Sequence, residues 1–186
     1  MSGHNKWSQI KRAKGINDSK RSKIFSKITK AITAASKQGG GDPDANPTLR
    51  LALEKARDAR MPKDNIDRAI AKGAGGGADS AEFYDVIYEG YGPNGEAFYI
   101  KGLTDNKNRT VAEVRNVFAK FGGSLGGVGS TAYIFATDPD NPAFTVDVTD
   151  PDQIDKLTKM LDELEDHEDI QDIFINFNLP EQEDEE

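Results

Sequence analysis

Apolar residues recur with a helical period in the first third of the chain. Between residues 18 and 38, six apolar positions fall on one face of a helix: Ile24, Phe25, Ile28, Ala31, Ile32 and Ala35. Asp18 or Ser19 can cap the start of this helix, and the glycines at 39–41 can end it. The pattern predicts an amphipathic helix of about 20 residues, with one face packed and the other exposed.

Two shorter helices are predicted next. Asn46 is a suitable N-cap and Pro47 a suitable first residue for a helix that continues to about Arg60. A third helix is expected from about Pro62 to Lys72. Three helices of this kind would form a small bundle. The glycine-rich stretch at 73–78 then predicts a flexible hinge.

The apolar period changes from helical to alternating after the hinge. Strands are expected at 83–91, 96–103, 130–136, 144–148 and 170–179, with helices at 110–121 and 151–164. Thr110 and Glu113 have the spacing of a capping box, and Asp150 precedes the second helix. From the second strand onward the order is βαββαβ, which is ferredoxin-like, with one extra N-terminal strand.

The predicted fold class is therefore α+β. We expect a basic helical domain with an N-terminal arm at 1–72, the hinge at 73–78, an acidic ferredoxin-like domain at 79–180 and an acidic tail at 181–186.

Charge divides the chain at the hinge. Residues 1–78 contain 17 Lys or Arg and seven Asp or Glu, a net charge of +10. The remaining residues contain seven basic and 25 acidic side chains, a net charge of −18, so the whole chain has a net charge of −8. Segments of opposite sign predict two domains with different partners.

The first 38 residues carry ten basic side chains and only one acid, Asp18. The candidate nucleic-acid-binding residues in this segment are Lys6, Trp7, Lys11, Arg12, Lys14, Lys20, Arg21, Lys23, Lys27 and Lys30. Basic side chains neutralise phosphates, and an aromatic ring among them can stack on a base. Two alternatives remain: the charges decorate a solvated helix face, and Trp7 anchors the arm to the first domain.

Composition excludes several classes of chemistry. Cysteine is absent, so disulfides, cysteine–zinc sites and thiol catalysis are excluded. The sequence contains two histidines, His4 and His167, and has no Walker A or dinucleotide-binding motif. It therefore gives no support for catalysis. We expect no enzyme activity, no cofactor and no metal.

No apolar stretch approaches the length of a membrane span, and the N-terminus lacks the apolar region of a signal peptide. We expect a cytoplasmic protein without a membrane partner or a small-molecule substrate. The alternative that the N-terminus is an organelle transit peptide stays open, because residues 1–17 are basic and contain no acidic residue.

Six stretches are specific enough to indicate a family. They are SGHNKWSQIKRAK, KRSKIFSKI, GGGDPDANPTLRLALEKAR, MPKDNIDRAI, YEGYGP and LTDNKNRTVAEVR. Together they closely resemble the YebC family, whose members are labelled transcriptional regulatory proteins and whose mitochondrial relatives are translational activators for a cytochrome oxidase subunit. Family members carry a third domain inserted within the second. Here the corresponding gap, about 136–143, is a turn, so the chain resembles a short form that lacks this domain.

The resemblance implies a regulator of gene expression that contacts nucleic acid. Action on DNA and action on the ribosome, at stalled or difficult sequences, are both consistent with the family. We favour the ribosome, because a lysine-dense arm and helix suit ribosomal RNA phosphates. The DNA alternative stays open, because Arg50, Arg57 and Arg60 lie on the second helix. An adaptor role for the acidic domain also stays open, and we expect a monomer.

A second candidate binding site lies at 106–110, before a predicted helix. Lys107, Asn108 and Arg109 are candidate anion-binding residues, because a helix start offers free N–H groups and two of these side chains are basic in an acidic domain. The alternative is a well-capped turn without a ligand.

Overall fold

The structure is a computed structural model that describes residues 18–75, 82–135 and 137–180. The described chain divides into two compact units, one built mainly from three helices and one from a sheet with its helices. Among the described helices, none combines the length and the hydropathy of a membrane span.

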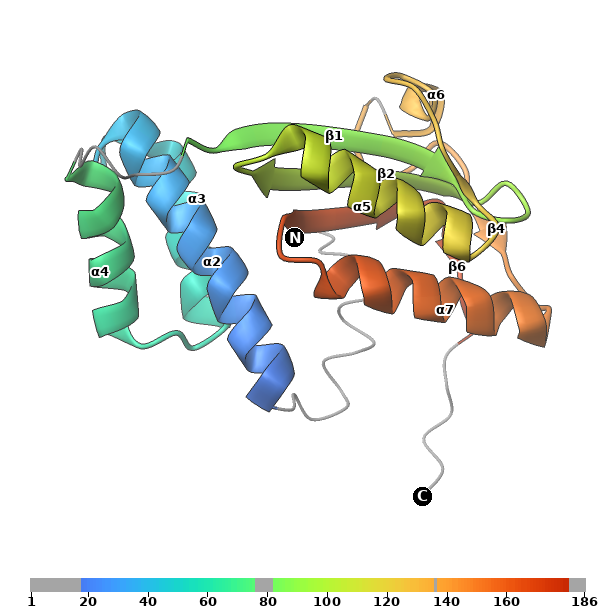
Figure 1. Ribbon diagram of the computed structural model, residues 1–186, viewed down its shortest axis with the longest axis horizontal. Coiled ribbons are helices and arrows are strands. Elements are labelled where there is room, and N and C mark those ends of the chain that lie inside the picture. Colours follow the sequence, from blue (N-terminus) through green and yellow to red (C-terminus); the bar gives the residue numbers. More distant parts are fainter. Residues whose placement is uncertain (1–17, 76–81, 136, 181–186) are drawn as a thin grey trace. The chain divides into compact units, whose positions relative to one another are not determined.

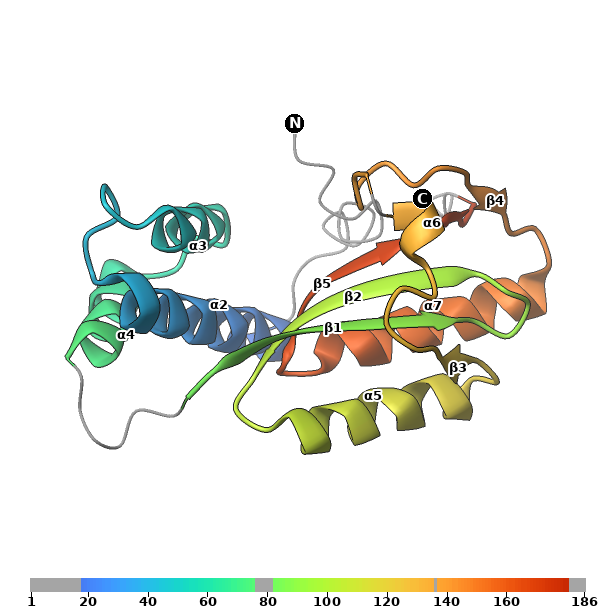
Figure 2. The ribbon, with the colours of Figure 1, turned by 90° about the horizontal axis from the view of Figure 1, so that it is seen from above.

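The helical unit contains α2 (Asp18–Gly39), α3 (Pro47–Asp58) and α4 (Lys63–Ala74). Helix α2 packs against both α3 and α4 (Figure 2). The core between them consists of Ile28, Ile32, Ala35, Leu49, Ala52, Ala56, Met61 and Ala69. The predicted apolar face of α2 is therefore the face that packs, and all three predicted helices are present, with ends that differ by about two residues.

Asn46 fixes the turn between α2 and α3. Its side-chain oxygen accepts a hydrogen bond from the N–H of Leu49 at 3.1 Å, as expected of an N-cap. Its amide nitrogen donates to the carbonyl oxygens of Ala35 and Gly40 at 2.8 and 2.9 Å. One buried side chain thus satisfies backbone groups at the end of one helix and the start of the next.

Helix α3 ends in a Schellman motif. The N–H of Arg60 donates to the carbonyl of Arg57, and the N–H of Met61 donates to that of Ala56, both at 2.9 Å. Arg60 has a φ of 54°, the left-handed conformation that usually favours glycine. The buried Met61 side chain supplies the apolar contact that accompanies this motif.

Gly73 belongs to α4, although the sequence predicts it in the hinge. The helix continues past the expected end at Lys72, and Gly73 is buried. A Cβ at this position would lie 2.3 Å from the carbonyl oxygen of Thr33 and 2.7 Å from the Cβ of Ser36. Glycine is therefore required by the close approach of α4 to α2, which the sequence pattern alone does not reveal.

Replacing Gly73 by Ala is expected to destabilise the helical unit by about 1–3 kcal/mol, because the methyl group would separate two backbones in contact. The gain in helix propensity, about 1 kcal/mol, opposes this loss. Ala71→Gly on the exposed side of the same helix is the matched control, with an expected cost of about 1 kcal/mol from propensity alone. Urea unfolding followed by circular dichroism measures both. A more stable Gly73→Ala variant would contradict the packing argument.

The second unit has an α+β fold, as the sequence predicts. Its elements are β1 (Tyr84–Tyr91), β2 (Ala97–Thr104), α5 (Lys107–Lys120), β3 (Ser124–Leu125), α6 (Ala132–Phe135), β4 (Val146–Asp147), α7 (Pro151–Asp166), β5 (Ile170–Ile175) and β6 (Phe177–Asn178). Four strands form one sheet in the order β3-β1-β2-β5, and β4 pairs with β6 in a parallel two-stranded ladder. Strands β3 and β5 run antiparallel to β1 and β2, respectively.

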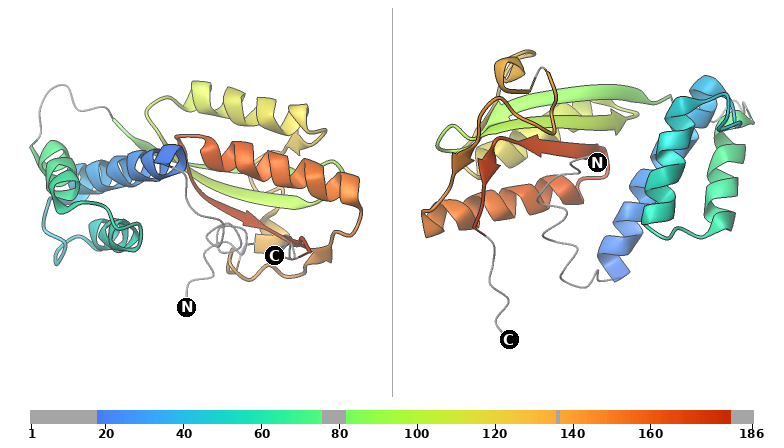
Figure 3. Two further views of the ribbon diagram at one scale, coloured as in Figure 1. Left: turned by 90° about the horizontal axis from the view of Figure 1, so that it is seen from below. Right: turned by 180° about the vertical axis from the view of Figure 1, so that it is seen from behind.

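Helices α5 and α7 cover the same face of the sheet (Figures 1 and 3). The core between helices and sheet includes Phe98, which lies 5.4 Å from the rings of both Phe118 and Phe177. Alternate residues of β2 point to the opposite face, where Ala97 and Tyr99 meet Ile134 and Phe135 of α6. The sheet thus has one extensively covered face and a second face that α6 covers in part.

The strand order corrects the ferredoxin-like reading in detail. In the βαββαβ arrangement, the third strand of the chain enters the middle of the sheet. Here β1, predicted as an extra N-terminal strand, takes that central position between β3 and β2. Two features of the ferredoxin-like arrangement remain. Strands β2 and β3 are joined by α5 and have one strand between them in the sheet, and α7 leads to β5, which pairs with β2.

The strand predicted at 130–136 is wrong. Residues 129–135 form a turn and the short helix α6, with helical hydrogen bonds from the N–H groups of Ala132, Ile134 and Phe135. The β-branched and aromatic residues here suggested a strand. The strand that pairs with β1 instead lies within the glycine-rich loop, at Ser124 and Leu125.

Candidate nucleic-acid interface

The predicted binding residues fall into three groups. Lys20, Arg21, Lys23, Lys27 and Lys30 lie on α2, and Lys107, Asn108 and Arg109 lie in the first turn of α5. The others lie outside the described residues: Lys6, Trp7, Lys11, Arg12 and Lys14.

Four of the α2 residues share one side of the helix. Lys20, Lys23, Lys27 and Lys30 follow one another at spacings of three, four and three residues, which place them on one helical face. The apolar stripe of Ile28 and Ile32 is rotated away from this face, toward α3 and α4. At 1.5 Å per residue, the lysine row extends about 15 Å along the helix.

Arg21 lies apart from this row. Its guanidinium carbon is 5.4 Å from the centre of the Phe25 ring, and Phe25 packs against the core of the helical unit. The side chain of Arg21 is exposed, so its charge remains in contact with solvent. The structure therefore brings together four of the predicted basic residues on α2 and separates the fifth.

The α/β unit has the opposite charge. Residues 84–180 contain seven basic and 18 acidic side chains, whereas residues 18–75 contain 13 basic and seven acidic ones. The charge division of the sequence thus coincides with the division into units. An anion is attracted to the helical unit and repelled by the α/β unit.

The start of α5 is capped by Asn106 rather than by the predicted capping box. The side-chain oxygen of Asn106 accepts a hydrogen bond from the N–H of Arg109 at 3.1 Å. Helix α5 therefore begins at Lys107, and Lys107, Asn108 and Arg109 lie in its first turn. Thr110, the predicted cap, is buried inside the helix.

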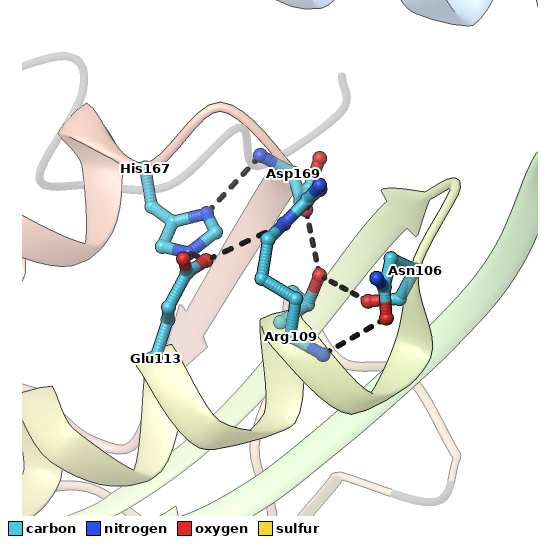
Figure 4. A network of polar contacts seen from close by, with 6 residues as sticks. Asn106, Arg109, Glu113, His167 and Asp169 are labelled. Carbon is cyan, nitrogen blue, oxygen red and sulfur yellow. Dashed lines mark hydrogen bonds and ion pairs between the residues drawn. The ribbon is translucent and has the colours of Figure 1, made fainter.

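Thr110 and Arg109 both contact Asp169, which lies just before β5. The Oγ1 of Thr110 is 2.6 Å from the Oδ2 of Asp169, and a guanidinium nitrogen of Arg109 is 2.8 Å from the same oxygen (Figure 4). The Asp169 side chain is 2% exposed, whereas that of Arg109 is 43% exposed. The anion nearest to the first turn of α5 is thus a carboxylate of the chain itself.

His167 and Glu113 extend this network. The Nε2 of His167 lies 2.9 Å from the Oε2 of Glu113, and its Nδ1 accepts a hydrogen bond from the N–H of Asp169 at 3.1 Å. Arg109 also lies 3.8 Å from Glu113 (Figure 4). The network joins α5 to the connection between α7 and β5.

Glu113, His167 and Asp169 offer three potential metal ligands within 4.8 Å of one another. Their hydrogen bonds do not suit a metal. Because Nδ1 of His167 accepts a backbone N–H, the ring proton lies on Nε2, the nitrogen that a metal would need. The Arg109 guanidinium already contacts both carboxylates. The geometry therefore supports a structural network rather than a cation site.

Glu89 is a buried acid that the sequence did not single out. It lies on β1 and accepts hydrogen bonds from the N–H of Gly129 at 2.7 Å and from the N–H and hydroxyl of Thr131 at 2.6 and 2.8 Å. Burial opposes ionisation, but the hydrogen bonds from Thr131 and Gly129 outweigh it and lower the pKa of Glu89. The carboxylate thus holds the turn that precedes α6.

Because the pKa of Glu89 is lowered in the folded state, its contribution to stability is present above the unfolded-state pKa and is lost as the pH falls toward the folded-state value. Glu89→Gln is expected to destabilise the α/β unit by about 2 kcal/mol at pH 7 and to flatten the loss of stability below about pH 4.3. Urea unfolding at pH values from 7 to 3 measures both effects. The exposed Glu168→Gln is the control, and an equal effect of the two substitutions would contradict this role of Glu89.

Comparisons with known proteins cover most of the chain. Residues 5–76 match the family model described as "TACO1/YebC protein N-terminal domain", and residues 83–138 match the one described as "TACO1/YebC second and third domain". A protein from Rubrobacter xylanophilus is 53% identical over 135 residues, which are 73% of this chain and 54% of that protein. One from Finegoldia magna is 56% identical over 135 residues, 73% of this chain and 56% of that protein.

Both of these relatives are named "Probable transcriptional regulatory protein". The chain spans about half the length of the curated relatives it matches. Among solved structures, a conserved hypothetical protein, Aq1575 from Aquifex aeolicus, aligns with a TM-score of 0.77 and 32% identity, over 91% of this chain and 95% of that chain.

Proposed function

Because the chain belongs to the TACO1/YebC family, we propose that it is a regulator of gene expression that binds nucleic acid through its helical unit, and that its target is ribosomal RNA on the ribosome. In this proposal it acts in translation, at stalled or difficult sequences. The observation that carries the proposal is the row of Lys20, Lys23, Lys27 and Lys30 along one face of α2.

The chemistry of this row suits a phosphate backbone. Lysine is a compact point charge, which neutralises phosphates without reading bases. A row of four positive charges about 15 Å long can neutralise several phosphates along a nucleic-acid backbone. Folded RNA is recognised largely through its shape and its phosphates, so a lysine row suits ribosomal RNA.

Transcriptional regulation through DNA is the second candidate, and the names of the relatives favour it. Reading base pairs in a major groove requires side chains such as arginine to be aimed at base edges. Arg50, one of the three arginines considered for this role, donates instead to the carbonyl oxygens of Pro43 and Asp44 at 3.2 and 3.1 Å. This engagement weighs against α3 as a recognition helix.

Co-sedimentation with ribosomes over a series of salt concentrations, with duplex DNA as competitor, tests the proposal. We expect binding that persists in excess DNA and weakens steeply as the salt concentration rises. Binding that DNA abolishes would favour the transcriptional alternative. No binding to either partner at low salt would contradict both.

A further inference from the structure

An exposed apolar surface lies around α6 and β4, on the acidic unit. Tyr133 is 66% exposed, and Phe144 and Val146 are each 47% exposed. The rings of Tyr133 and Phe144 lie 6.4 Å apart at an angle of 32°. We call Tyr133, Phe144 and Val146 the β4 patch. Large apolar side chains gathered on one surface mark an interaction site more often than isolated ones.

Neighbouring hydrogen bonds hold the β4 patch in place. The N–H of Ala143 donates to the carbonyl of Ile134 at 2.8 Å, which ties the segment before β4 to α6. Tyr91 donates its hydroxyl to the carbonyl of Ser130 at 2.5 Å, which ties β1 to the turn before α6. These hydrogen bonds hold the backbone next to Tyr133 and Phe144 before any partner binds, which lowers the entropic cost of binding.

Strand β4 also has a backbone edge that no other described strand pairs with. The N–H groups of Val146 and Val148 donate to the carbonyls of Asn176 and Asn178, toward β6. Because backbone groups alternate along a strand, those of Thr145 and Asp147 point to the other side. The sheet that contains β4 consists of β4 and β6 among the described residues, so this other side is an edge. Residues 143–147 are all exposed.

The stretch of chain that contains β4 carries charge of one sign. Between Lys120 and Lys156 the chain contains no Lys or Arg. The same stretch carries six aspartates: Asp138, Asp140, Asp147, Asp150, Asp152 and Asp155. The chain on either side of the apolar side chains is therefore acidic in sequence. Charge complementarity favours a basic partner and disfavours a nucleic acid.

We propose that the β4 patch and the free edge of β4 bind an extended, basic segment of another protein as an added strand. Backbone hydrogen bonds to Thr145 and Asp147 would provide affinity, and alternate apolar side chains would rest on Tyr133, Phe144 and Val146. Lysine or arginine on the opposite face of the segment would meet the surrounding aspartates. The proposal does not depend on the lysine row of α2, which lies in the other unit.

A fluorescent eight-residue peptide of alternating lysine and valine is the probe, and anisotropy with the full chain measures its binding. Thr145→Pro removes an outward N–H without removing a hydrogen bond to β6, and Phe144→Ser removes part of the patch. We expect each substitution to weaken binding about tenfold at an unchanged melting temperature. Leu51→Ser, at an exposed leucine of α3, is the matched control and is expected to leave binding unchanged.

A peptide with glutamate in place of lysine is expected to bind at least tenfold more weakly than the probe, and salt is expected to weaken binding of the lysine peptide. Equal binding of the two peptides, or an unchanged affinity in Thr145→Pro, would overturn the proposal. Dimerisation of the chain that Phe144→Ser abolishes would assign the patch to a second copy instead. If an RNA oligonucleotide competes with the peptide for the unaltered protein and does not bind the Phe144→Ser variant, the patch would be assigned to nucleic acid.

Because Phe144→Ser and the lysine row lie in different units, ribosome co-sedimentation of the same variant separates this proposal from the proposed function. We expect Phe144→Ser to retain the salt-sensitive RNA contact while losing the peptide. A variant that loses both would indicate a single shared site and would overturn the independent peptide site.

Discussion

Reversing Lys20, Lys23, Lys27 and Lys30 to glutamate is expected to abolish ribosome binding at physiological salt. Each phosphate contact contributes roughly 0.7 to 0.9 to the slope of log affinity against log salt concentration. If all four side chains contact phosphates, the slope should fall by roughly three units. The measurement is co-sedimentation of the variant and the unaltered protein over the same salt series.

The matched control reverses four basic residues of α3 and α4: Arg57, Lys63, Arg68 and Lys72. This variant has the same net charge and alters the same unit, so it separates a specific face from the general field of the unit. Circular dichroism establishes that both variants remain folded. Equal loss of binding in the two variants would show that binding depends on the net positive charge of the helical unit and not on the lysine row of α2. Loss in the control alone, with duplex DNA as the preferred partner, would contradict the ribosomal proposal.

Asp169→Ala is expected to destabilise the α/β unit by about 2–3 kcal/mol, and so to lower its melting temperature by roughly 8–20 °C. The reason is that the substitution leaves Thr110 buried without its carboxylate partner and removes the ion pair of Arg109. Asp169→Asn keeps an oxygen for Thr110 and is expected to cost less. Calorimetry and urea unfolding measure the two variants.

The exposed neighbour Glu168 provides the control, because its substitution by Ala should change stability by less than about 0.5 kcal/mol. A double-mutant cycle of Asp169→Ala with Arg109→Ala isolates the coupling between the two side chains. Equal, small effects at 168 and 169 would contradict the structural role of Asp169. The cycle also bears on anion binding by Arg109, since loss of binding in Arg109→Ala indicates a direct contact only where the melting temperature is maintained.

Local patterns predicted the elements whose signals are themselves local. The stripe from Ile24 to Ala35 gave α2, and Asn46 and Asp150 are the N-caps that their positions before proline suggest. Each of these inferences depends on residues within about four positions of one another.

The expectations that were wrong depend on partners far away in sequence. Thr110 has the right neighbours for a capping box, but its hydroxyl contacts Asp169, 59 residues later. The segment at 130–136 has the composition of a strand, but Glu89, 42 residues before Thr131, accepts hydrogen bonds from the N–H and the hydroxyl of Thr131 and so fixes a turn there. Buried acids that bind backbone N–H groups leave only a weak signal in the sequence, an isolated acid within an apolar strand.

The order of strands in the sheet affects how the unit is assembled during synthesis. The two central strands, β1 and β2, are the first to leave the ribosome, and a tight turn joins them. The outer strands β3 and β5 follow later in the chain, and each adds to an edge that is already present. No strand has to enter between two paired neighbours. The sheet can therefore form from its centre outward in the order of translation, because the strand that each outer strand pairs with has already been synthesised.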